Sequence, residues 1–492
     1  MNTTTKFDIK NDRNLTMLVD FYELTMANGY LNNGVEDTIA YFDMFFRRIP
    51  DSGGYCIMAG VEQLIDYLKK LEFTSEDIKY LRSKNLFNEK FLNYLENFKF
   101  ECDVWAIPEG TPVFPSEPLI TVRGPIMQAQ FIETMILLTI NHQTLIATKA
   151  ARICEAAGYR PVMEFGSRRA QGYDGALYGA RAAIIGGCSS TACTMADELF
   201  DVPVTGTMAH SWIQLFDTEY EAFKAWASTY PDNTVLLVDT YNVLKSGIPN
   251  AIKVFDEVLK PLRKRPKAIR IDSGDITYLT IEARKLLDAA GYEDCKITIS
   301  NSLDEFIIKA VLENGAQIDS FGVGERLITA KSEPVFGGVY KLVAIEKHGE
   351  IIPKIKISEN VEKITNPGFK SLYRVYDNAT KKAIADLIAI NGETFDYTRP
   401  LELFHPNYTW KKKKVKNYTI KELMVKIFDK GQQCYESPSV MDIKNYSLEA
   451  RETLWAEIRR LQNPHQYYVD LSKDLWNLKE FLLHEYSSMY EE

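Results

Sequence analysis

The middle of the chain repeats one pattern: a short apolar run ends in polar, acidic or glycine residues, and a stretch of helical periodicity follows. Successive runs lie about 20 to 35 residues apart, the length of a strand followed by a helix. The runs are PVMEF (161–165), AIIGG (183–187), PVTGT (203–207), TVLLVDT (234–240), AIRIDSG (268–274), KITISNS (296–302) and IDSFGVG (318–324). We interpret them as parallel strands of an α/β fold and expect an irregular (β/α) barrel, whose active groups gather where strands end.

The flanking segments have a different pattern. Residues 13–35 have helical spacing, 101–125 read as a small β-rich unit, and 130–158 read as one long helix or two abutting helices. Residues 339–359 and 369–377 predict strands, and 447–462 and 474–488 predict helices. We therefore expect an α+β N-terminal domain (1–128), a barrel with the active site (129–345), and a C-terminal α+β region (346–492) that packs back on the first.

Composition narrows the class of protein. The 492 residues are 46% apolar and carry a formal net charge of −9, whereas a nucleic-acid binder usually has a basic surplus. The basic run WKKKKVK (410–416) predicts a solvated loop or strand edge rather than an anion site. The seven cysteines include no CxxC pair, and we find neither a secretory signal nor a membrane-length apolar run. A cytoplasmic protein without a membrane or nucleic-acid partner is expected.

Two arginines directly follow the first run of the repeat. Arg168 and Arg169 lie in a glycine-flanked loop of the segment EFGSRRAQGYDGA (164–176). Guanidinium groups bind carboxylates and phosphates through paired hydrogen bonds. The loop indicates an anion site, and the alternative is that one arginine pairs with an internal carboxylate.

Among the six histidines, His210 alone lies at an expected strand end among small polar residues, in TGTMAHSW (205–212). Thr207 and Ser211 add hydroxyl groups nearby. Imidazole serves as acid, base or nucleophile near neutral pH. A lone histidine is more often structural, but this setting favours a functional one.

The segment IRIDSGD (269–275) places Arg270 and Asp272 two residues apart, so both face the same side of a strand. A carboxylate there can hold ribose hydroxyls or the water shell of Mg²⁺. The alternative is a buried Arg–Asp pair. Asp239 ends the preceding run in the same way.

Two glycine-rich turns follow the last runs, in FGVGERL (321–327) and FGGVYKL (336–342). Gly322, Gly324, Gly337 and Gly338 are the glycines concerned. Such a turn before a helix exposes amide groups to a phosphate. Many barrels bind phosphate after their last strands, which favours this interpretation.

Taken together, these segments resemble nicotinate phosphoribosyltransferases. The resemblance runs in order from about residue 15 to 375 and includes DFYELTMANGY (20–30), FFRRIP (45–50), IPEGTPVFPSEPL (107–119), NHQTLIATKAAR (141–152), GTMAHSW (206–212) and SNSLDE (300–305). It implies a fold of the type II phosphoribosyltransferase kind. It also implies a reaction in which nicotinate and 5-phosphoribosyl 1-pyrophosphate give nicotinate mononucleotide for NAD salvage, coupled to ATP hydrolysis and supported by Mg²⁺.

The resemblance also implies roles for the candidate residues. His210 would carry a phosphoryl group, and Asp272 would act beside it. Tyr22, from a neighbouring subunit of a homodimer with shared active sites, would stack on nicotinate. The remaining nicotinate contacts would come from Arg168, Thr207 and Arg270. The phosphates would be held by Arg169, Ser211, Gly322, Gly324, Glu325, Gly337 and Gly338. No metal ligand is assigned.

Three other functions fit parts of the pattern. A nicotinamide phosphoribosyltransferase shares the fold and the histidine, but its substrate has no carboxylate and its site needs fewer cations. A barrel glycosidase would use strand-end carboxylates such as Asp239 and Asp272 in a pocket poor in arginine. A non-catalytic metabolite-binding protein needs no reactive histidine.

Overall fold

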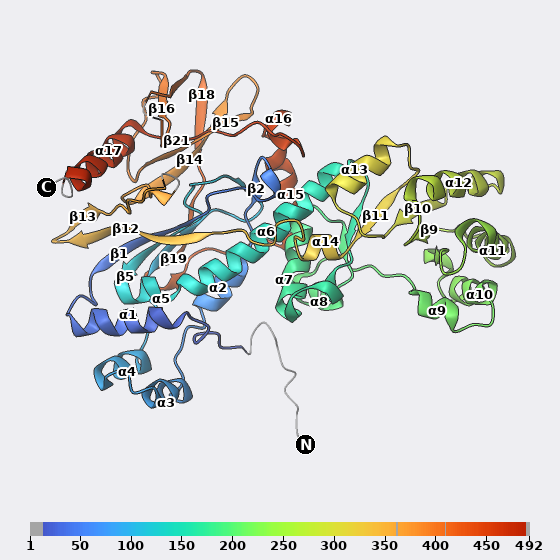
Figure 1. The fold of residues 1–492 in the computed structure, drawn as a ribbon, viewed down its shortest axis with the longest axis horizontal. Coiled ribbons are helices and arrows are strands. Elements are labelled where there is room, and N and C mark those ends of the chain that lie inside the picture. The colour runs from blue at the N-terminus through green and yellow to red at the C-terminus, as the bar shows by residue number, and fades with distance from the viewer. Residues whose placement is uncertain (1–12, 361–362, 409, 489–492) are drawn as a thin grey trace. The chain divides into compact units, whose positions relative to one another are not determined.

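The computed structural model describes residues 13–360, 363–408 and 410–488, and the chain forms two compact units (Figure 1). The first unit combines residues 1–145, 335–438 and 445–492, and the second combines 146–334 with 439–444. The division into three domains expected from the sequence stays a prediction.

The second unit is built on a six-stranded sheet in which every strand pair is parallel. In order across the sheet the strands are β7 (Ser190–Thr191), β6 (Val162–Glu164), β11 (Ser320–Val323), β10 (Lys296–Ile299), β9 (Ala268–Ile271) and β8 (Val235–Leu237). Five of these strands fall inside the predicted apolar runs. The α/β class is therefore confirmed.

Two of the predicted strands are wrong. Residues 183–187 lie at the end of helix α7 (Gly172–Ile185), and the strand β7 begins only at Ser190. Periodicity cannot separate a buried helix end from a short buried strand, because both read as a continuous apolar run. Residues 203–207 contribute one isolated bridge, between Thr191 and Val204.

The sheet of the second unit is open in this structure. Within the described residues, no strand pairing joins β7 to β8, which are the two ends of the sheet. The carboxyl ends of its parallel strands nevertheless share one edge, because parallel strands run in one direction. Side chains that follow β8, β9 and β10 are thereby brought close together.

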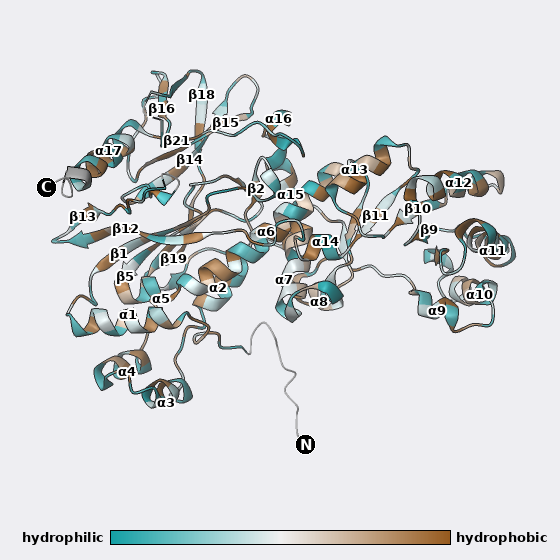
Figure 2. Ribbon diagram, in the orientation of Figure 1, coloured by the Kyte–Doolittle hydropathy of each residue, from teal (hydrophilic) through white to brown (hydrophobic). Residues whose placement is uncertain are grey.

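Helices follow the strands, as βα units require. Asp275 caps α12 (Ile276–Ala289) by accepting from Tyr278 N, and the helix buries Thr280, Ala283 and Leu287 on one face. Figure 2 shows helices of this unit with both hydrophilic and hydrophobic residues. Besides α7 and α12, this unit contains the helices α8 (Thr194–Phe200), α9 (His210–Gln214), α10 (Glu219–Thr229), η4 (Val243–Gly247), α11 (Ile248–Val254), η5 (Phe255–Leu259), α13 (Glu305–Glu313) and α14 (Glu325–Ile328).

The first unit contains a seven-stranded antiparallel sheet that joins strands from distant parts of the chain. In order across the sheet they are β13 (Glu350–Pro353), β12 (Val339–Lys347), β1 (Ile39–Phe45), β5 (Ile120–Pro125), β3 (Asp103–Ala106), β19 (Val425–Asp429) and β20 (Gln432–Gln433). The β3–β19 pairing places Val425 opposite Ala106. A strand from the C-terminal part of the chain therefore extends a sheet whose other strands include three from the N-terminal part.

A second sheet of this unit is formed by β17 (Lys412–Val415), β16 (Leu401–Phe404), β21 (Val469–Leu471), β15 (Ala383–Ile390), β14 (Lys370–Asp377) and β18 (Tyr418–Glu422). The lysine run thus forms an edge strand, as expected. Arg374 and Asp386 face each other across β14 and β15 in a fully buried ion pair of 2.6 Å. Tyr467 Oη donates to the same carboxylate at 2.9 Å, so this buried charge is satisfied.

The remaining elements are the strands β2 (Cys56–Ile57) and β4 (Pro112–Val113) and the helices η1 (Pro50–Ser52), α1 (Phe21–Asn32), α2 (Val61–Leu68), α3 (Ser75–Ser83), α4 (Glu89–Glu96), α5 (Ile126–Phe131), α6 (Glu133–Ala157), α15 (Val440–Glu452), α16 (Ala456–Arg459) and α17 (Lys473–Ser488). Of the two alternatives expected for residues 130–158, the structure has one long helix, since α6 covers nearly all of this range and α5 precedes it. In the described part of the chain, no helix combines the length and apolarity that membrane crossing requires.

Candidate functional site

Arg270 is the centre of a hydrogen-bonded cluster at the carboxyl edge of the second unit's sheet. It lies on β9, and its guanidinium donates to Thr207 Oγ1 at 2.6 Å and to the Met208 carbonyl at 3.2 Å. Burial lowers the pKa of Arg270, while Asp272 and Asp239 oppose the shift. The side chain nevertheless keeps 15% of its surface exposed, so a bound anion can reach it.

Ser300 connects Arg270 to Asp272. Its hydroxyl accepts from Arg270 Nε at 2.8 Å and donates to Asp272 Oδ1 at 2.6 Å. The direct approach of Arg270 Nη2 to Asp272 Oδ1 is only 3.8 Å, and the Asp272 side chain is 30% exposed. The two groups therefore do not form a closed, buried pair, and Asp272 keeps an oxygen for a ligand.

Asp239, which lies just after β8, positions the Asp272 backbone. Its Oδ2 accepts from Asp272 N at 3.0 Å and from Ser273 Oγ at 2.6 Å. Its Oδ1 is buried, with no hydrogen-bond partner. A buried carboxylate oxygen without a donor is unfavourable unless it binds a ligand or cation.

His210 lies beside this cluster, at the start of α9. Its Nδ1 is 3.0 Å from Thr240 Oγ1, and its Nε2 is 3.8 Å from Asp272 Oδ2. The imidazole is 40% exposed. One ring nitrogen is thus held in place while the ring remains open to solvent and substrates. Ser211 follows it on α9 and is exposed.

Arg168 and Arg169 form the short helix η2 (Ser167–Arg169) after β6. Both side chains are exposed, and in the ranges 13–360, 363–408 and 410–488 neither pairs with a carboxylate. The charge on Arg168 contributes to the lowered pKa of Arg270. The internal ion pair considered as the alternative is therefore not formed, and the guanidinium groups are available to an anion.

Buried Glu164 fixes the loop that carries these arginines. Its Oε2 accepts from Thr191 Oγ1 at 2.6 Å, and its Oε1 accepts from Gly166 N. Burial raises the pKa of Glu164, and the two hydrogen bonds oppose that shift. The fully buried Glu164 carboxyl group thus fixes the start of the loop through these hydrogen bonds.

Gly322 in β11 and Gly324 directly after it allow this loop to approach the strand closely. A Cβ at Gly322 would lie 2.5 Å from the Phe165 ring, and one at Gly324 would lie 3.0 Å from the Phe165 carbonyl oxygen. Glu325 begins α14, and its side chain pairs with Lys331 at 2.7 Å, which lowers the pKa of the exposed Glu325 carboxyl. The Glu325 side chain is therefore already engaged by a cation.

Three predicted site residues lie in the first unit. Tyr22 is 44% exposed on α1. Gly337 has a positive φ of 74°, and Gly338 N donates to Asn141 Oδ1 at 3.1 Å. A Cβ at Gly338 would lie 2.3 Å from that same oxygen, so the Asn141 side chain would have to shift to admit one.

Sequence reasoning missed the contributions of Thr240 and Ser300. Both follow strands of the repeat, β8 and β10, at the positions where functional side chains are expected. A hydroxyl residue after a strand is common, however, so it gives a weak signal without a histidine or arginine in the same motif. Asp275, in contrast, serves as the cap of α12.

The acidic pair suits Mg²⁺. In the described residues there is no group of three or more histidine, cysteine, aspartate or glutamate side chains able to enclose a metal. Mg²⁺ is commonly held by one or two carboxylates together with substrate phosphates and water. The exposed oxygen of Asp272 and the unpartnered Oδ1 of Asp239 fit that kind of site.

The chain is similar to known proteins over nearly its whole length. Residues 17–141 match the family model of the nicotinate phosphoribosyltransferase N-terminal domain, and residues 369–479 match that of the C-terminal domain. The chain is 44% identical to the nicotinate phosphoribosyltransferase of Bacillus subtilis over 98% of each chain. The human nicotinic acid phosphoribosyltransferase structure superposes with a TM-score of 0.83 at 28% identity, covering 94% of this chain and 99% of that one.

A more distant structure shows the fold alone. The nicotinate-nucleotide pyrophosphorylase of Pyrococcus furiosus superposes with a TM-score of 0.67 at 23% identity, over 92% of this chain and 99% of that one. The identity to the Bacillus protein extends over nearly the full length of both chains. The chain therefore belongs to the nicotinate phosphoribosyltransferase family.

Proposed function

We propose that the chain transfers the phosphoribosyl group of 5-phosphoribosyl 1-pyrophosphate to nicotinate, giving nicotinate mononucleotide for NAD salvage, and that ATP hydrolysis is coupled to this transfer. The observation that carries the proposal is the cluster of Arg270, Asp272 and His210 at one edge of a parallel sheet. Family membership supplies the substrate class.

In the transfer step the pyridine nitrogen of nicotinate attacks the anomeric carbon of the ribose. A C–N bond forms, the C–O bond to pyrophosphate breaks, and pyrophosphate leaves with that electron pair. Arg168 and Arg270 offer guanidinium groups to the nicotinate carboxylate. Thr207 accepts a hydrogen bond from Arg270 and thereby orients the Arg270 guanidinium. Asp272 stabilises positive charge that develops on the ribose ring.

His210 accepts the γ-phosphoryl group of ATP, and ADP leaves. Water later hydrolyses the phosphohistidine, which returns the free imidazole and releases phosphate. Thr240 positions the imidazole through Nδ1, and Asp272 lies on its Nε2 side. The exposed ring has room for a phosphoryl group beside phosphate-binding loops.

The phosphate groups are held by Arg169, Ser211 and the turns at Gly322, Gly324, Glu325, Gly337 and Gly338. Arg169, which is exposed, offers charge, and the turns offer backbone amides to a phosphate. Of Glu325 the amide is the useful group, since the side chain pairs with Lys331. Asp239 and Asp272 would hold Mg²⁺, which neutralises phosphate charge when bound.

The active unit is a homodimer in the cytoplasm. Tyr22 is exposed on α1 and would reach the nicotinate site of a neighbouring subunit, where its ring would stack on the pyridine. The six parallel strands would form the wall of a barrel whose closure involves the segment around Val204.

A substrate-omission assay tests this function. Nicotinate mononucleotide formation is measured with nicotinate, 5-phosphoribosyl 1-pyrophosphate and ATP, each omitted in turn. We expect no product without either of the first two and a slower reaction without ATP. His210→Ala should remove the ATP stimulation and the acid-labile phosphate on the protein, whereas His484→Ala, at an exposed site on α17, should retain both. Equal rates for His210→Ala and the parent would exclude the phosphohistidine.

Substrate choice is tested by competition between nicotinate and nicotinamide. Arg168 and Arg270 favour a substrate with a carboxylate, so nicotinate should react preferentially. Equal or faster turnover of nicotinamide would overturn the assignment.

A further inference from the structure

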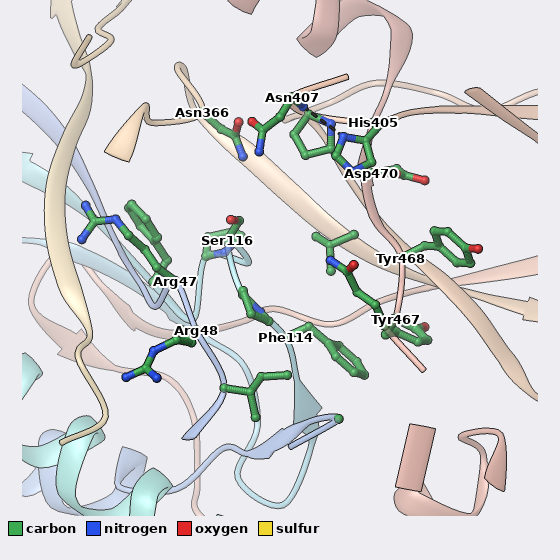
Figure 3. Close-up of a pocket in the computed structure, with 18 of the residues that line it drawn as sticks. Arg47, Arg48, Phe114, Ser116, Asn366, His405, Asn407, Tyr467, Tyr468 and Asp470 are labelled. Atoms are coloured by element: carbon green, nitrogen blue, oxygen red, sulfur yellow. Dashed lines mark hydrogen bonds between the residues drawn. The ribbon is translucent and has the colours of Figure 1, made fainter. Parts of the chain in front are cut away.

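The first unit contains a cavity of about 670 Å³ that none of the residues proposed for catalysis lines. It lies among the segment after β1, the loops before β14 and before β17, the segment leading into β21, and helix α17. Figure 3 shows His405, Asn407 and Asn366 together on one wall, with Arg47 and Arg48 on another and Tyr467 and Tyr468 across from them. A volume of this size accommodates an organic ligand rather than a lone ion.

Two buried lysines line this cavity, and only one of them has a counter-charge. Lys370 pairs with the buried carboxylate of Asp43 at 2.9 Å. Lys479 is 3% exposed and donates to two neutral oxygens, Asn366 Oδ1 at 3.0 Å and the Pro406 carbonyl at 3.2 Å. Among the residues that the structure describes, no carboxylate lies within ion-pair distance of Lys479. Burial lowers the pKa of Lys479 to about 8, and the charge of Glu480, which is beyond ion-pair distance, opposes the shift only in part.

Such a buried ammonium group is unfavourable by itself, because desolvation is not repaid by an opposite charge. An anion bound in the cavity would supply that charge. Lys370, in the same cavity, pairs with Asp43, whereas Lys479 has only neutral acceptors. The two lysines therefore differ in their need for a bound anion.

The wall formed by His405, Asn407 and Asn366 offers further hydrogen-bond donors. His405 Nδ1 accepts from the amides of Asn407 and Tyr408, each at 3.1 Å, so the neutral imidazole carries its proton on Nε2. Asn366 uses its oxygen to accept from Lys479, which leaves its NH₂ group to donate. Burial lowers the pKa of His405, and the charges of Lys411 and Lys479 lower it further, which places both ammonium groups near the ring.

The cavity has two acidic side chains, and both lie near lysines. Asp43 is occupied by Lys370 and by Thr121 Oγ1. Asp470 is 4% exposed, and burial raises its pKa while Lys411 and Lys413 oppose the shift. The lining lysines, Lys370, Lys411 and Lys479, outnumber these two carboxylates.

Aromatic side chains complete the cavity. Tyr468 is half-buried, and Lys411 Nζ lies 5.5 Å from its ring centroid. Phe114 and Tyr467 stack on each other with centroids 3.9 Å apart and form part of the lining. Flat apolar surfaces next to cationic donors suit a ligand that combines a planar ring with an anionic group.

We propose that this cavity is a second ligand site, separate from the catalytic residues, for a phosphate monoester that carries an aromatic base and has the size of a mononucleotide. The phosphate lies at Lys479, Lys411, His405 Nε2 and the Asn366 amide, and the base lies along Tyr468. The site does not depend on the function proposed above, since none of the residues proposed for catalysis or substrate binding lines the cavity.

Isothermal titration of the full chain with adenosine 5′-monophosphate tests the proposal. Adenosine and inorganic phosphate serve as partial probes at the same ionic strength. The variants are Lys479→Met, Lys411→Met, the control Lys412→Met, and Arg270→Ala in the second unit. Lys412 is the exposed neighbour of Lys411 and does not line the cavity.

We expect one site per chain, present in the parent, Lys412→Met and Arg270→Ala, and weakened at least about tenfold in Lys479→Met and Lys411→Met, since each removes a charge-assisted contact. Adenosine should bind much more weakly than its monophosphate. Because Lys411 is only half-buried, its variant keeps the test valid if Lys479→Met fails to fold.

Four results would overturn the proposal. The first two are no binding by the parent and an affinity of both cavity variants equal to that of the parent. The third is loss of binding in Arg270→Ala, which would place the nucleotide in the second unit. The fourth is inorganic phosphate binding as tightly as the monophosphate, which would leave a simple anion site.

Discussion

The hydroxyl of Thr240 lies 3.0 Å from Nδ1 of His210, so the residue that follows β8 holds the imidazole that begins α9. The two residues are 30 positions apart in the sequence and meet only because the ends of neighbouring segments share one edge of the sheet. This contact leads to the first prediction.

Replacing Thr240 with Val should reduce the ATP-stimulated rate by roughly fivefold, the effect of losing one hydrogen bond worth about 1 kcal/mol. The reaction without ATP should change little, because Thr240 acts only through His210. Thr240→Ser retains the hydroxyl and should restore the stimulation. The measurement is nicotinate mononucleotide formation with and without ATP, and equal behaviour of the Val and Ser variants would contradict the role.

Replacing Ser300 with Ala removes the link between Arg270 and Asp272. Both charged groups lose a partner, and hydrogen bonds to charged groups are worth about 1.5 to 3 kcal/mol. We expect kcat/KM for nicotinate to fall by about tenfold to a hundredfold. Ser302→Ala, at an exposed position in the same loop, is the control and should have no effect.

Two glycine-to-alanine changes in the second unit should affect stability in opposite directions. At Gly322 the new Cβ would lie 2.5 Å from the Phe165 ring, and the resulting overpacking should cost about 1 to 3 kcal/mol. At Gly175, inside α7, the nearest atom is 3.8 Å away, and alanine should stabilise the helix by up to about 1 kcal/mol. Urea unfolding of both variants checks the two signs, and a destabilised Gly175→Ala would show that the helix needs that glycine for another reason.

Glu23 should make stability fall as pH rises. Its carboxyl is fully buried, Oε1 accepts from Thr134 Oγ1 at 2.8 Å, and Oε2 is without a partner. Burial raises its pKa from 4.5 to about 8, with Glu133 and Asp20 adding to the shift. Between these values the folded state holds a proton that the unfolded state has lost, so the free energy of unfolding decreases with pH.

Glu23→Gln should remove this dependence and stabilise the protein at pH 8 by about 1 to 3 kcal/mol. Glu96→Gln, at an exposed site at the end of α4, should leave the pH dependence unchanged. Unfolding midpoints from pH 5 to pH 8 give the comparison. Parallel pH profiles for the parent and Glu23→Gln would show that Glu23 is ionised in the folded protein.

The α/β class and most strands of the second unit could be predicted because they depend on local patterns. Apolar runs such as AIRIDSG combine β-branched residues with a polar end, and the structure has β9 there. The strand predicted at 183–187 was wrong because Ala182–Ile185 are buried in a helix. An uninterrupted apolar stretch in a buried helix looks the same as one in a buried strand.

The site could be predicted in part, for a related reason. Arg270, Asp272 and His210 have side chains whose chemistry is informative even in a single motif. Thr240 and Ser300 become informative only through their contacts, which depend on how β8, β9 and β10 are ordered. The counter-charge missing at Lys479 is likewise a property of the packed structure, since its neighbours come from residues 366 and 406.

The pairing of β3 with β19 has a consequence for biosynthesis. A nascent chain that has reached residue 334 contains nearly all of the second unit, whose sheet uses only residues 162–323. The first unit has by then only its opening segment, and β3 must wait for residues 425–429 to leave the ribosome. Until then β3 presents an unpaired edge, a surface on which partly made chains associate. Translation arrest between residues 334 and 425 should therefore yield a finished central unit attached to an aggregation-prone start.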